Sequence, residues 1–298
     1  MPDAAPQPPP LRKPDWLKRR LPTGETFNEV RELIEAGKLH TVCQEAKCPN
    51  IWECYSHRTA TFLILGECCT RNCRFCSVAP GLPGPLDPHE PGRVAEAVER
   101  MGLKYAVVTS VTRDDLPDGG AAHFAATIRE IRRWVPEAEI EVLIPDFQGD
   151  RAALETVLHA RPDVLNHNIE TVPRLYSRVR PQADYRRSLE LLRRAGESAP
   201  LIPTKSGLML GLGERPEEIR QTLRDLREVG CRILTLGQYL QPSPAHLPVE
   251  AYVPPEDFEN WRKAALDLGF SEVASAPFVR SSYHAREAFH ALGMKAPS

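Results

Sequence analysis

The chain has 298 residues, of which 42% are hydrophobic, and its formal net charge is -2. This length fits one large α/β barrel or two smaller domains. A charge this close to zero excludes the broad positive field that attracts nucleic acid or an anionic membrane surface. No run approaches the roughly 18 apolar residues of a membrane span, and the Pro-rich start lacks the features of a secretory signal. We therefore expect a cytoplasmic protein that binds neither nucleic acid nor membrane.

The first segment of the chain is unlike the rest. Residues 1–22 are Pro-rich and then basic, which predicts a flexible or wrapping tail. Residues 24–39 place Val30, Leu33 and Ile34 at helical spacing, which predicts a helix that ends near Gly37.

Three cysteines follow this helix with the spacing C-x4-C-x5-C: Cys43, Cys48 and Cys54. Pro49 argues against one continuous helix through them, so we expect a folded-back loop in which the thiols converge. The spacing alone leaves two interpretations open. One is a zinc knuckle completed by His57 or His40, and the other is an iron–sulfur cluster.

A second set has the spacing C-x3-C-x2-C directly after an apolar run at 60–65: Cys69, Cys73 and Cys76. Cysteine thiolates are the usual ligands of iron–sulfur cubes, and three ligands leave one of four irons open for a substrate. Zinc prefers four ligands and paired C-x2-C knuckles, and disulfides need an oxidising compartment. The spacing favours iron–sulfur chemistry and leaves zinc or disulfides as alternatives.

Cysteine counting supports metal binding. Seven of the eight cysteines lie between Cys43 and Cys76, whereas a disulfide framework would spread them over the chain. Arg71 and Arg74 place positive charge beside the second set, which we expect to favour the thiolate form.

From residue 60 onward, strand-like and helix-like segments alternate, which indicates a parallel sheet with right-handed crossovers. The predicted strands are 60–65, 105–109, 139–144, 164–169, 205–210 and 232–236. The predicted helices are 93–101, 121–134, 150–159, 184–196, 216–229 and 255–268. Six such units predict a partial (β/α)6 barrel of TIM-like type, because a full barrel needs eight.

Polar residues stand where these strands end, and sites in such folds lie at those ends. Asn166, Asn168 and Glu170 alternate and so share one face, which could bind a charged cosubstrate. Gln238 and Tyr239 would face the cavity or its rim. By composition alone, the segment Arg280-Ser-Ser-Tyr283 reads as a surface turn.

With Phe75 before its last cysteine, the second set resembles the signature of radical S-adenosylmethionine (SAM) enzymes. The chain resembles the lipoyl synthase family over about residues 25–290. This resemblance rests on the order of the two cysteine sets and on the segments Lys205–Glu214 and Arg280–Tyr283. A different radical SAM sulfur inserter or methylthiotransferase, and a zinc-stabilised binding protein without catalysis, are the alternatives.

The resemblance implies two 4Fe–4S clusters. Cys69, Cys73 and Cys76 would bind the catalytic cluster that cleaves SAM. The ligands of an auxiliary cluster would be Cys43, Cys48, Cys54 and Ser282, with Ser281 as the alternative serine. The resemblance, together with the positions of these residues at strand ends, assigns SAM binding to Asn168, Glu170, Gly211, Gln238 and Tyr239.

The implied reaction replaces C–H bonds at C6 and C8 of an octanoyl group by C–S bonds. That group is carried on a lysine of a lipoyl carrier domain. Carriers of this kind are the glycine cleavage H protein and the acyltransferase subunits of 2-oxoacid dehydrogenases, and a flavodoxin- or ferredoxin-type protein would supply electrons. The corresponding domain division is an N-terminal extension (1–58), a radical SAM partial barrel (59–270) and a C-terminal extension (271–298).

Overall fold

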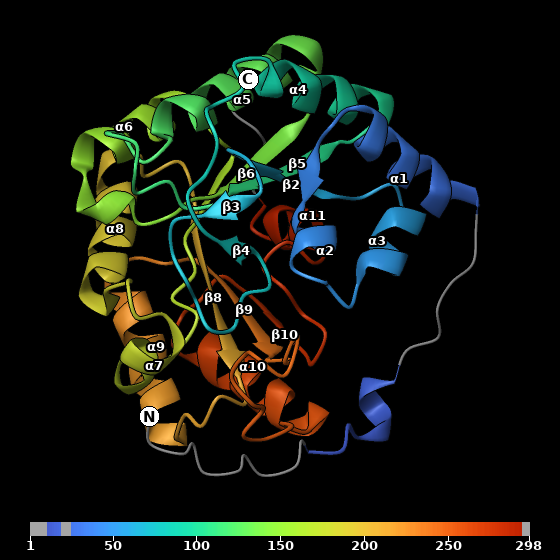
Figure 1. Ribbon diagram of the computed structural model, residues 1–298. Coiled ribbons are helices and arrows are strands. Elements are labelled where there is room, and N and C mark those ends of the chain that lie inside the picture. The colour runs from blue at the N-terminus through green and yellow to red at the C-terminus, as the bar shows by residue number, and fades with distance from the viewer. Residues whose placement is uncertain (1–10, 19–24, 294–298) are drawn as a thin grey trace, which may run out of the picture.

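A computed structural model describes residues 11–18 and 25–293 of the chain (Figure 1). Its centre is an eight-stranded sheet in the order β1-β2-β5-β6-β7-β8-β9-β10, in which every pairing except β1–β2 is parallel. The strands are β1 (His40–Thr41), β2 (Thr61–Ile64), β5 (Tyr105–Ser110), β6 (Glu139–Leu143), β7 (Val164–Asn166), β8 (Thr204–Leu210), β9 (Ile233–Gln238) and β10 (Glu272–Ser275). A separate pair is formed by β3 (Cys68–Cys69) and β4 (Ala79–Pro80).

The prediction of a six-stranded partial barrel is confirmed in its parallel core, which consists of β2 and β5–β9. The strands β1 and β10 were not predicted. They are two and four residues long, too short for an alternating pattern to stand out. Within the described residues, β1 and β10 form the two edges of the sheet, and no strand pairing joins them.

Helices cover the outer face of the sheet, and the crossover helices form an arc around the strands (Figure 1). The crossover helices are α4 (Glu90–Arg100), α5 (Ala121–Trp134), α6 (Arg151–His159), α8 (Tyr185–Ser198), α9 (Pro216–Glu228) and α10 (Pro255–Asp267). The remaining helices are α1 (Glu25–Ala36), α2 (Val42–Glu45), α3 (Ile51–Ser56), α7 (Tyr176–Val179), α11 (Ala285–His290) and the 3-10 turns η1 (Asp15–Leu17), η2 (Phe147–Gly149) and η3 (Pro173–Leu175).

The crossover helices pack by one apolar stripe. In α5, Phe124, Ile128 and Ile131 recur at helical spacing, and all three are fully buried. Removing a side chain of this size from water stabilises the fold by about 1.5–3 kcal/mol. Among the described residues, no helix combines the length and the hydropathy needed to cross a bilayer.

The first cysteine set lies on a small helical unit beside β2. Its helices α2 and α3 are separate, which confirms that no single helix runs through Pro49. The Thr41 hydroxyl accepts a hydrogen bond from the Gln44 amide and also contacts the Tyr55 hydroxyl at 2.8 Å. These bonds tie the start of α2 to α3, so the loop that carries the thiols is held at both ends.

After β10 the chain crosses from one edge of the sheet towards the other. On the β9 side, the Gln238 amide donates to the Pro277 carbonyl at 3.2 Å. On the β2 side, the Thr61 hydroxyl donates to the Ser282 hydroxyl at 2.7 Å. Beyond it, α11 buries Phe289 against Tyr105 near the amino-terminal ends of the strands. The crossing segment brings the Arg280–Tyr283 motif to the interval between the sheet's two edges. Most of the predicted tail, namely residues 1–10 and 19–22, lies outside the described residues.

Candidate active site and cluster-binding loops

Both cysteine sets face one cavity. It has a volume of about 550 Å³ and opens at the carboxyl-terminal ends of the parallel strands, where the barrel rule places chemistry. Its lining includes five cysteines: Cys43, Cys48, Cys69, Cys73 and Cys76. The sixth predicted ligand, Cys54, lies on α3, outside the cavity lining. Two loops that β2 separates in the sequence thus present thiols to the same cavity.

Backbone contacts shape the second cysteine loop. The Cys69 thiol accepts hydrogen bonds from the amides of Arg71 and Thr112, at 3.4 and 3.3 Å. The Arg74 amide donates to the Val179 carbonyl at 2.9 Å. A ring nitrogen of His246 lies 2.9 Å from the Cys76 carbonyl. The loop is therefore held by contacts from three other parts of the chain.

The thiols of Cys73 and Cys76 are less acidic than the positive charge near them predicts. Burial raises the pKa of Cys76 to about 12 and also raises the pKa of Cys73, although Arg180 and Arg71 oppose the shift at Cys73. Arg71 favours the Cys73 thiolate, as predicted, but burial outweighs it. The cation that acts most strongly on Cys73 is Arg180, which the sequence reasoning missed. A bound metal supplies the missing positive charge and deprotonates such thiols, so the loop fits an iron–sulfur cluster.

Burial also raises the pKa of a thiol in the first cysteine set. Burial raises the pKa of Cys43 far above its ordinary value, and the nearby thiols of Cys48 and Cys54 raise it further. Both thiols are thus near enough to Cys43 to act on its charge. A hydrogen bond from the Thr61 backbone favours the Cys43 thiolate. The set consists of sulfur donors, with Cys43 buried and Cys48 and Cys54 half-buried, and thiolates of this kind suit a soft iron–sulfur centre.

Zinc and disulfides fit these loops less well. In the described part of the chain, no three Cys, His, Asp or Glu side chains meet closely enough to hold a single metal ion. A tetrahedral zinc site needs such a meeting point, whereas each thiolate on a cube binds a different iron. Cys69, Cys73 and Cys76 are free thiols, so no disulfide joins them to the first set.

The Arg280–Tyr283 motif belongs to the cavity, and its interpretation as a surface turn is wrong. Ser281 and Ser282 both line the cavity and are half-buried. The Tyr283 hydroxyl donates to the Glu53 carboxylate at 2.7 Å, one residue from Cys54. Composition could not reveal this placement, because it depends on contacts across more than 200 residues.

The two serines of the motif point to different neighbours. Ser281 accepts a hydrogen bond from the Asn168 side chain at 2.6 Å. Ser282 accepts one from Thr61, whose backbone also bonds Cys43. Ser282 is therefore the serine linked through Thr61 to Cys43, and its role as a cluster ligand stays a prediction.

The predicted polar face after β7 lines the cavity as expected. Asn166, Asn168 and Glu170 are all part of its wall. The side-chain oxygens of Asn166 and Asn168 are buried and lack a hydrogen-bond partner, which leaves two acceptors for a ligand. Burial raises the pKa of Glu170, while Arg180 lowers it. This wall offers acceptors and one carboxyl group to a cationic or hydrogen-bond-donating molecule.

The three other residues predicted to contact SAM also meet protein backbone around the cavity. Gly211 does not line the cavity, and a Cβ there would lie 2.3 Å from the Ala251 carbonyl, so its missing side chain admits protein backbone. Gln238 lines the cavity, but its amide bonds the backbone of Leu210, Tyr239, Ala251 and Val253. The Tyr239 hydroxyl donates to the Leu247 carbonyl at 2.7 Å. Gln238 and Tyr239 both line the cavity, so these bonds position its wall, and SAM binding by the three residues stays a prediction.

Sequence reasoning also missed a buried charge pair. Lys205 lies 2.9 and 3.0 Å from the two carboxylate oxygens of Glu141, and both side chains are 1% exposed. The same carboxylate accepts hydrogen bonds from Tyr105 at 2.7 Å and Asn166 at 3.1 Å. Glu141 lines the cavity, so this pair closes part of its wall.

Comparison with known proteins agrees with this geometry. The sequence model of the radical SAM superfamily matches residues 63–226, and that of the N-terminal domain of lipoyl synthase matches residues 6–48. Among solved structures, methylornithine synthase (PylB) has a TM-score of 0.52 and 14% identity over 92% of this chain and 94% of its own. The hydrogenase maturase HydG has a TM-score of 0.52 and 17% identity over 90% and 75%. The fold and the cysteine loop define a radical SAM enzyme.

Closer relatives identify the family. A lipoyl synthase of Rubrobacter xylanophilus is 60% identical over 92% of this chain and 86% of its own. One of Caldanaerobacter subterraneus subsp. tengcongensis is 57% identical over 92% and 96%. The chain belongs to the lipoyl synthase family, whose members insert sulfur by radical SAM chemistry and use iron–sulfur clusters and SAM. Its substrates are octanoyl groups on lipoyl carriers.

Proposed function

We propose that the two cysteine sets divide the reaction between them. Cys69, Cys73 and Cys76 hold the SAM-cleaving cluster, and Cys43, Cys48, Cys54 and Ser282 hold the auxiliary cluster. When bound, the first cluster supplies the electron that cleaves SAM, and the second supplies the sulfur for C6 and C8. The observation that supports this division is the shared cavity, where both loops would reach the same acyl chain.

The chain's own residues would prepare this cavity. Asn168 and Glu170 present acceptors and a carboxyl group suited to the ammonium and hydroxyl groups of SAM. Gln238 and Tyr239 hold the 239–253 segment against the barrel through bonds to its backbone. Burial of the cavity wall excludes water, which protects reactive intermediates.

We propose three units around this site: residues 1–58 carry the auxiliary-cluster loop, 59–270 form the radical SAM barrel, and 271–298 supply the serine. Suitable carriers are the glycine cleavage H protein and acyltransferase subunits of 2-oxoacid dehydrogenases. A flavodoxin- or ferredoxin-type protein would donate electrons. Free thiols in the second loop suit the reducing cytoplasm.

Mass spectrometry of an octanoyl-lysine peptide, incubated with SAM and reductant, tests the division. We expect the parent enzyme to add two sulfur atoms and to release 5′-deoxyadenosine. Cys69→Ala should abolish both products. Cys43→Ala should still release 5′-deoxyadenosine but add no sulfur. Sulfur insertion by Cys43→Ala at the parent level would contradict the auxiliary role.

A further inference from the structure

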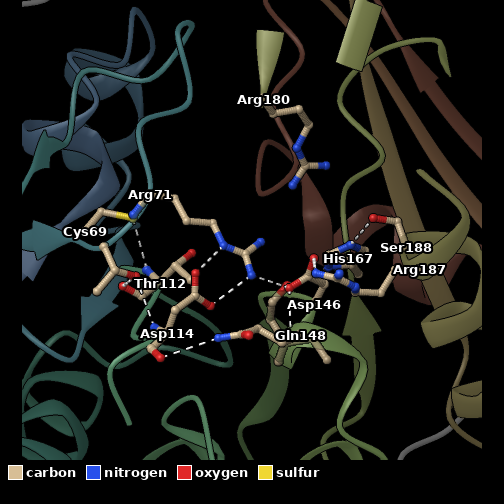
Figure 2. A network of polar contacts seen from close by, with 12 residues as sticks. Cys69, Arg71, Thr112, Asp114, Asp146, Gln148, His167, Arg180, Arg187 and Ser188 are labelled. Carbon is tan, nitrogen blue, oxygen red and sulfur yellow. Dashed lines mark hydrogen bonds and ion pairs between the residues drawn. The ribbon is translucent and has the colours of Figure 1, made fainter. Parts of the chain in front are cut away.

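The second cysteine loop is fastened to two neighbouring loops by one side chain, Arg71 (Figure 2). Its Nε and Nη2 donate to both carboxylate oxygens of Asp114, at 2.7 and 2.9 Å. Nη2 also donates to Asp146 at 2.6 Å. The Arg71 side chain is 4% exposed and that of Asp146 is fully buried. One guanidinium therefore joins the cysteine loop to the loops that follow β5 and β6.

The same segments meet again at Cys69. The amides of Arg71 and Thr112 both donate to its sulfur. Thr70 ties these segments together, because its amide donates to the Thr112 carbonyl at 3.0 Å and its hydroxyl accepts from the Asp114 amide at 3.0 Å. The side-chain bonds and the two N–H groups at sulfur thus belong to one rigid unit.

Stability alone does not explain this arrangement. A buried ion pair is often no more stable than apolar residues of similar volume, because both charges lose their hydration. Hydrogen bonds to a ligand sulfur, in contrast, draw negative charge from it and set the reduction potential of a cluster. Asp146 also accepts from the Gln148 amide at 3.0 Å, and Arg187 lies 3.4 Å from its second oxygen, so the carboxylate that holds Arg71 is itself held (Figure 2).

We propose that Arg71, Asp114 and Asp146 form a positioning clamp that keeps two N–H donors on the Cys69 sulfur and thereby makes the SAM-cleaving cluster easier to reduce. This inference rests on the proposed function, which assigns Cys69 as a cluster ligand. Arg71 acts through the loop and is a positioning residue.

Arg71→Lys tests the clamp without changing its charge, because lysine cannot bond both carboxylates in the same fork geometry. Reduction would be followed by electron paramagnetic resonance, using the signal that SAM perturbs, at the potential where the parent cluster is half reduced. We expect the ratio of reduced to oxidised cluster to fall about three- to tenfold, as loss of one ordinary hydrogen bond would produce. An unchanged ratio in a fully loaded Arg71→Lys enzyme would overturn the clamp.

Arg132→Lys is the matched control. Arg132 bonds the buried carboxylate of Asp163 at 2.5 Å, but Asp163 precedes β7, at the opposite end of the strands from the cysteines. We expect this variant to leave the reduced fraction unchanged. A fall equal to that of Arg71→Lys would assign the effect to general destabilisation and overturn the proposal.

Thr70→Val is a second test of the clamp, for the case in which the Arg71→Lys enzyme does not bind its cluster. This nearly isosteric change removes the hydroxyl bonds to the 112–114 segment and leaves Arg71 intact. We expect a smaller fall in the reduced fraction, and no fall would refute the clamp. A separate result addresses the proposed function: if Cys69→Ala retains the SAM-sensitive signal, the ligand assignment itself fails.

Discussion

The Glu141–Lys205 pair allows a quantitative test of how the cavity wall is held. Both groups are almost fully buried, and the carboxylate is satisfied by Lys205, Tyr105 and Asn166. Lys205→Met removes the positive partner at similar volume and leaves a buried charge uncompensated. Breaking such a pair costs about 3–5 kcal/mol. We therefore expect Lys205→Met to lower the free energy of unfolding by that amount.

The double variant Lys205→Met with Glu141→Gln separates charge from packing. Glutamine keeps an acceptor for Tyr105 but carries no charge, so most of the lost stability should return. Anaerobic urea unfolding followed by circular dichroism measures both variants. Arg151→Met is the control, because its partner Glu155 lies in an exposed pair that adds little stability. The reasoning fails if Lys205→Met costs less than about 1 kcal/mol or if the double variant is no more stable.

Three further predictions concern other parts of the site. Burial lowers the pKa of His167 from 6.5 to about 4, so the unfolded chain binds more protons than the folded chain below pH 6.5. The free energy of unfolding should therefore fall by about 1.4 kcal/mol per pH unit from pH 6.5 towards pH 4. Unfolding of His167→Gln at several pH values should lose this dependence. Tyr283→Phe removes the bond to Glu53, so iron analysis should find less auxiliary cluster while SAM cleavage continues; full iron content would contradict this. In Gly211→Ala, the new Cβ would lie 2.3 Å from a backbone oxygen at a φ of +99°, so this variant should unfold at a temperature well below that of the parent. Gly196→Ala is the control, because open space surrounds this helical position, and its melting temperature should not fall in this way.

The sequence predicted the parallel core because its strands and helices are long and regularly patterned. In α5, apolar residues recur every three or four positions, and the helix has the predicted bounds of 121–134. The two short strands at the sheet edges carry no such pattern. Their existence depends on pairing with neighbours that only the folded chain provides.

Local sequence patterns identified several residues of the cavity wall. Five of the six cysteines in the two sets line the cavity, as do Asn168 and Glu170. Gly211 and Gln238 were predicted to bind SAM, but neither a family resemblance nor a strand-end position reveals which parts of the protein they contact. Both are engaged with the backbone of the 251–253 segment, which is distant in sequence.

The partners of the cysteine loop were missed for different reasons. Asp146 lies three residues after the end of β6 and could have been identified from the strand-end rule. Arg180 follows α7, and no local pattern connects it with Cys73, more than 100 residues earlier. Its effect on the pKa of that thiol arises only when the fold brings the two together.

Iron and sulfide analysis of triple cysteine variants, after anaerobic reconstitution, tests most directly whether each cysteine set holds its own cluster. We predict about eight irons per chain for the parent enzyme, which corresponds to two cubes. Replacement of either set by alanine should leave about four, and replacement of both should leave none. About four irons in the parent, or the loss of all iron when only one set is replaced, would contradict two independent clusters.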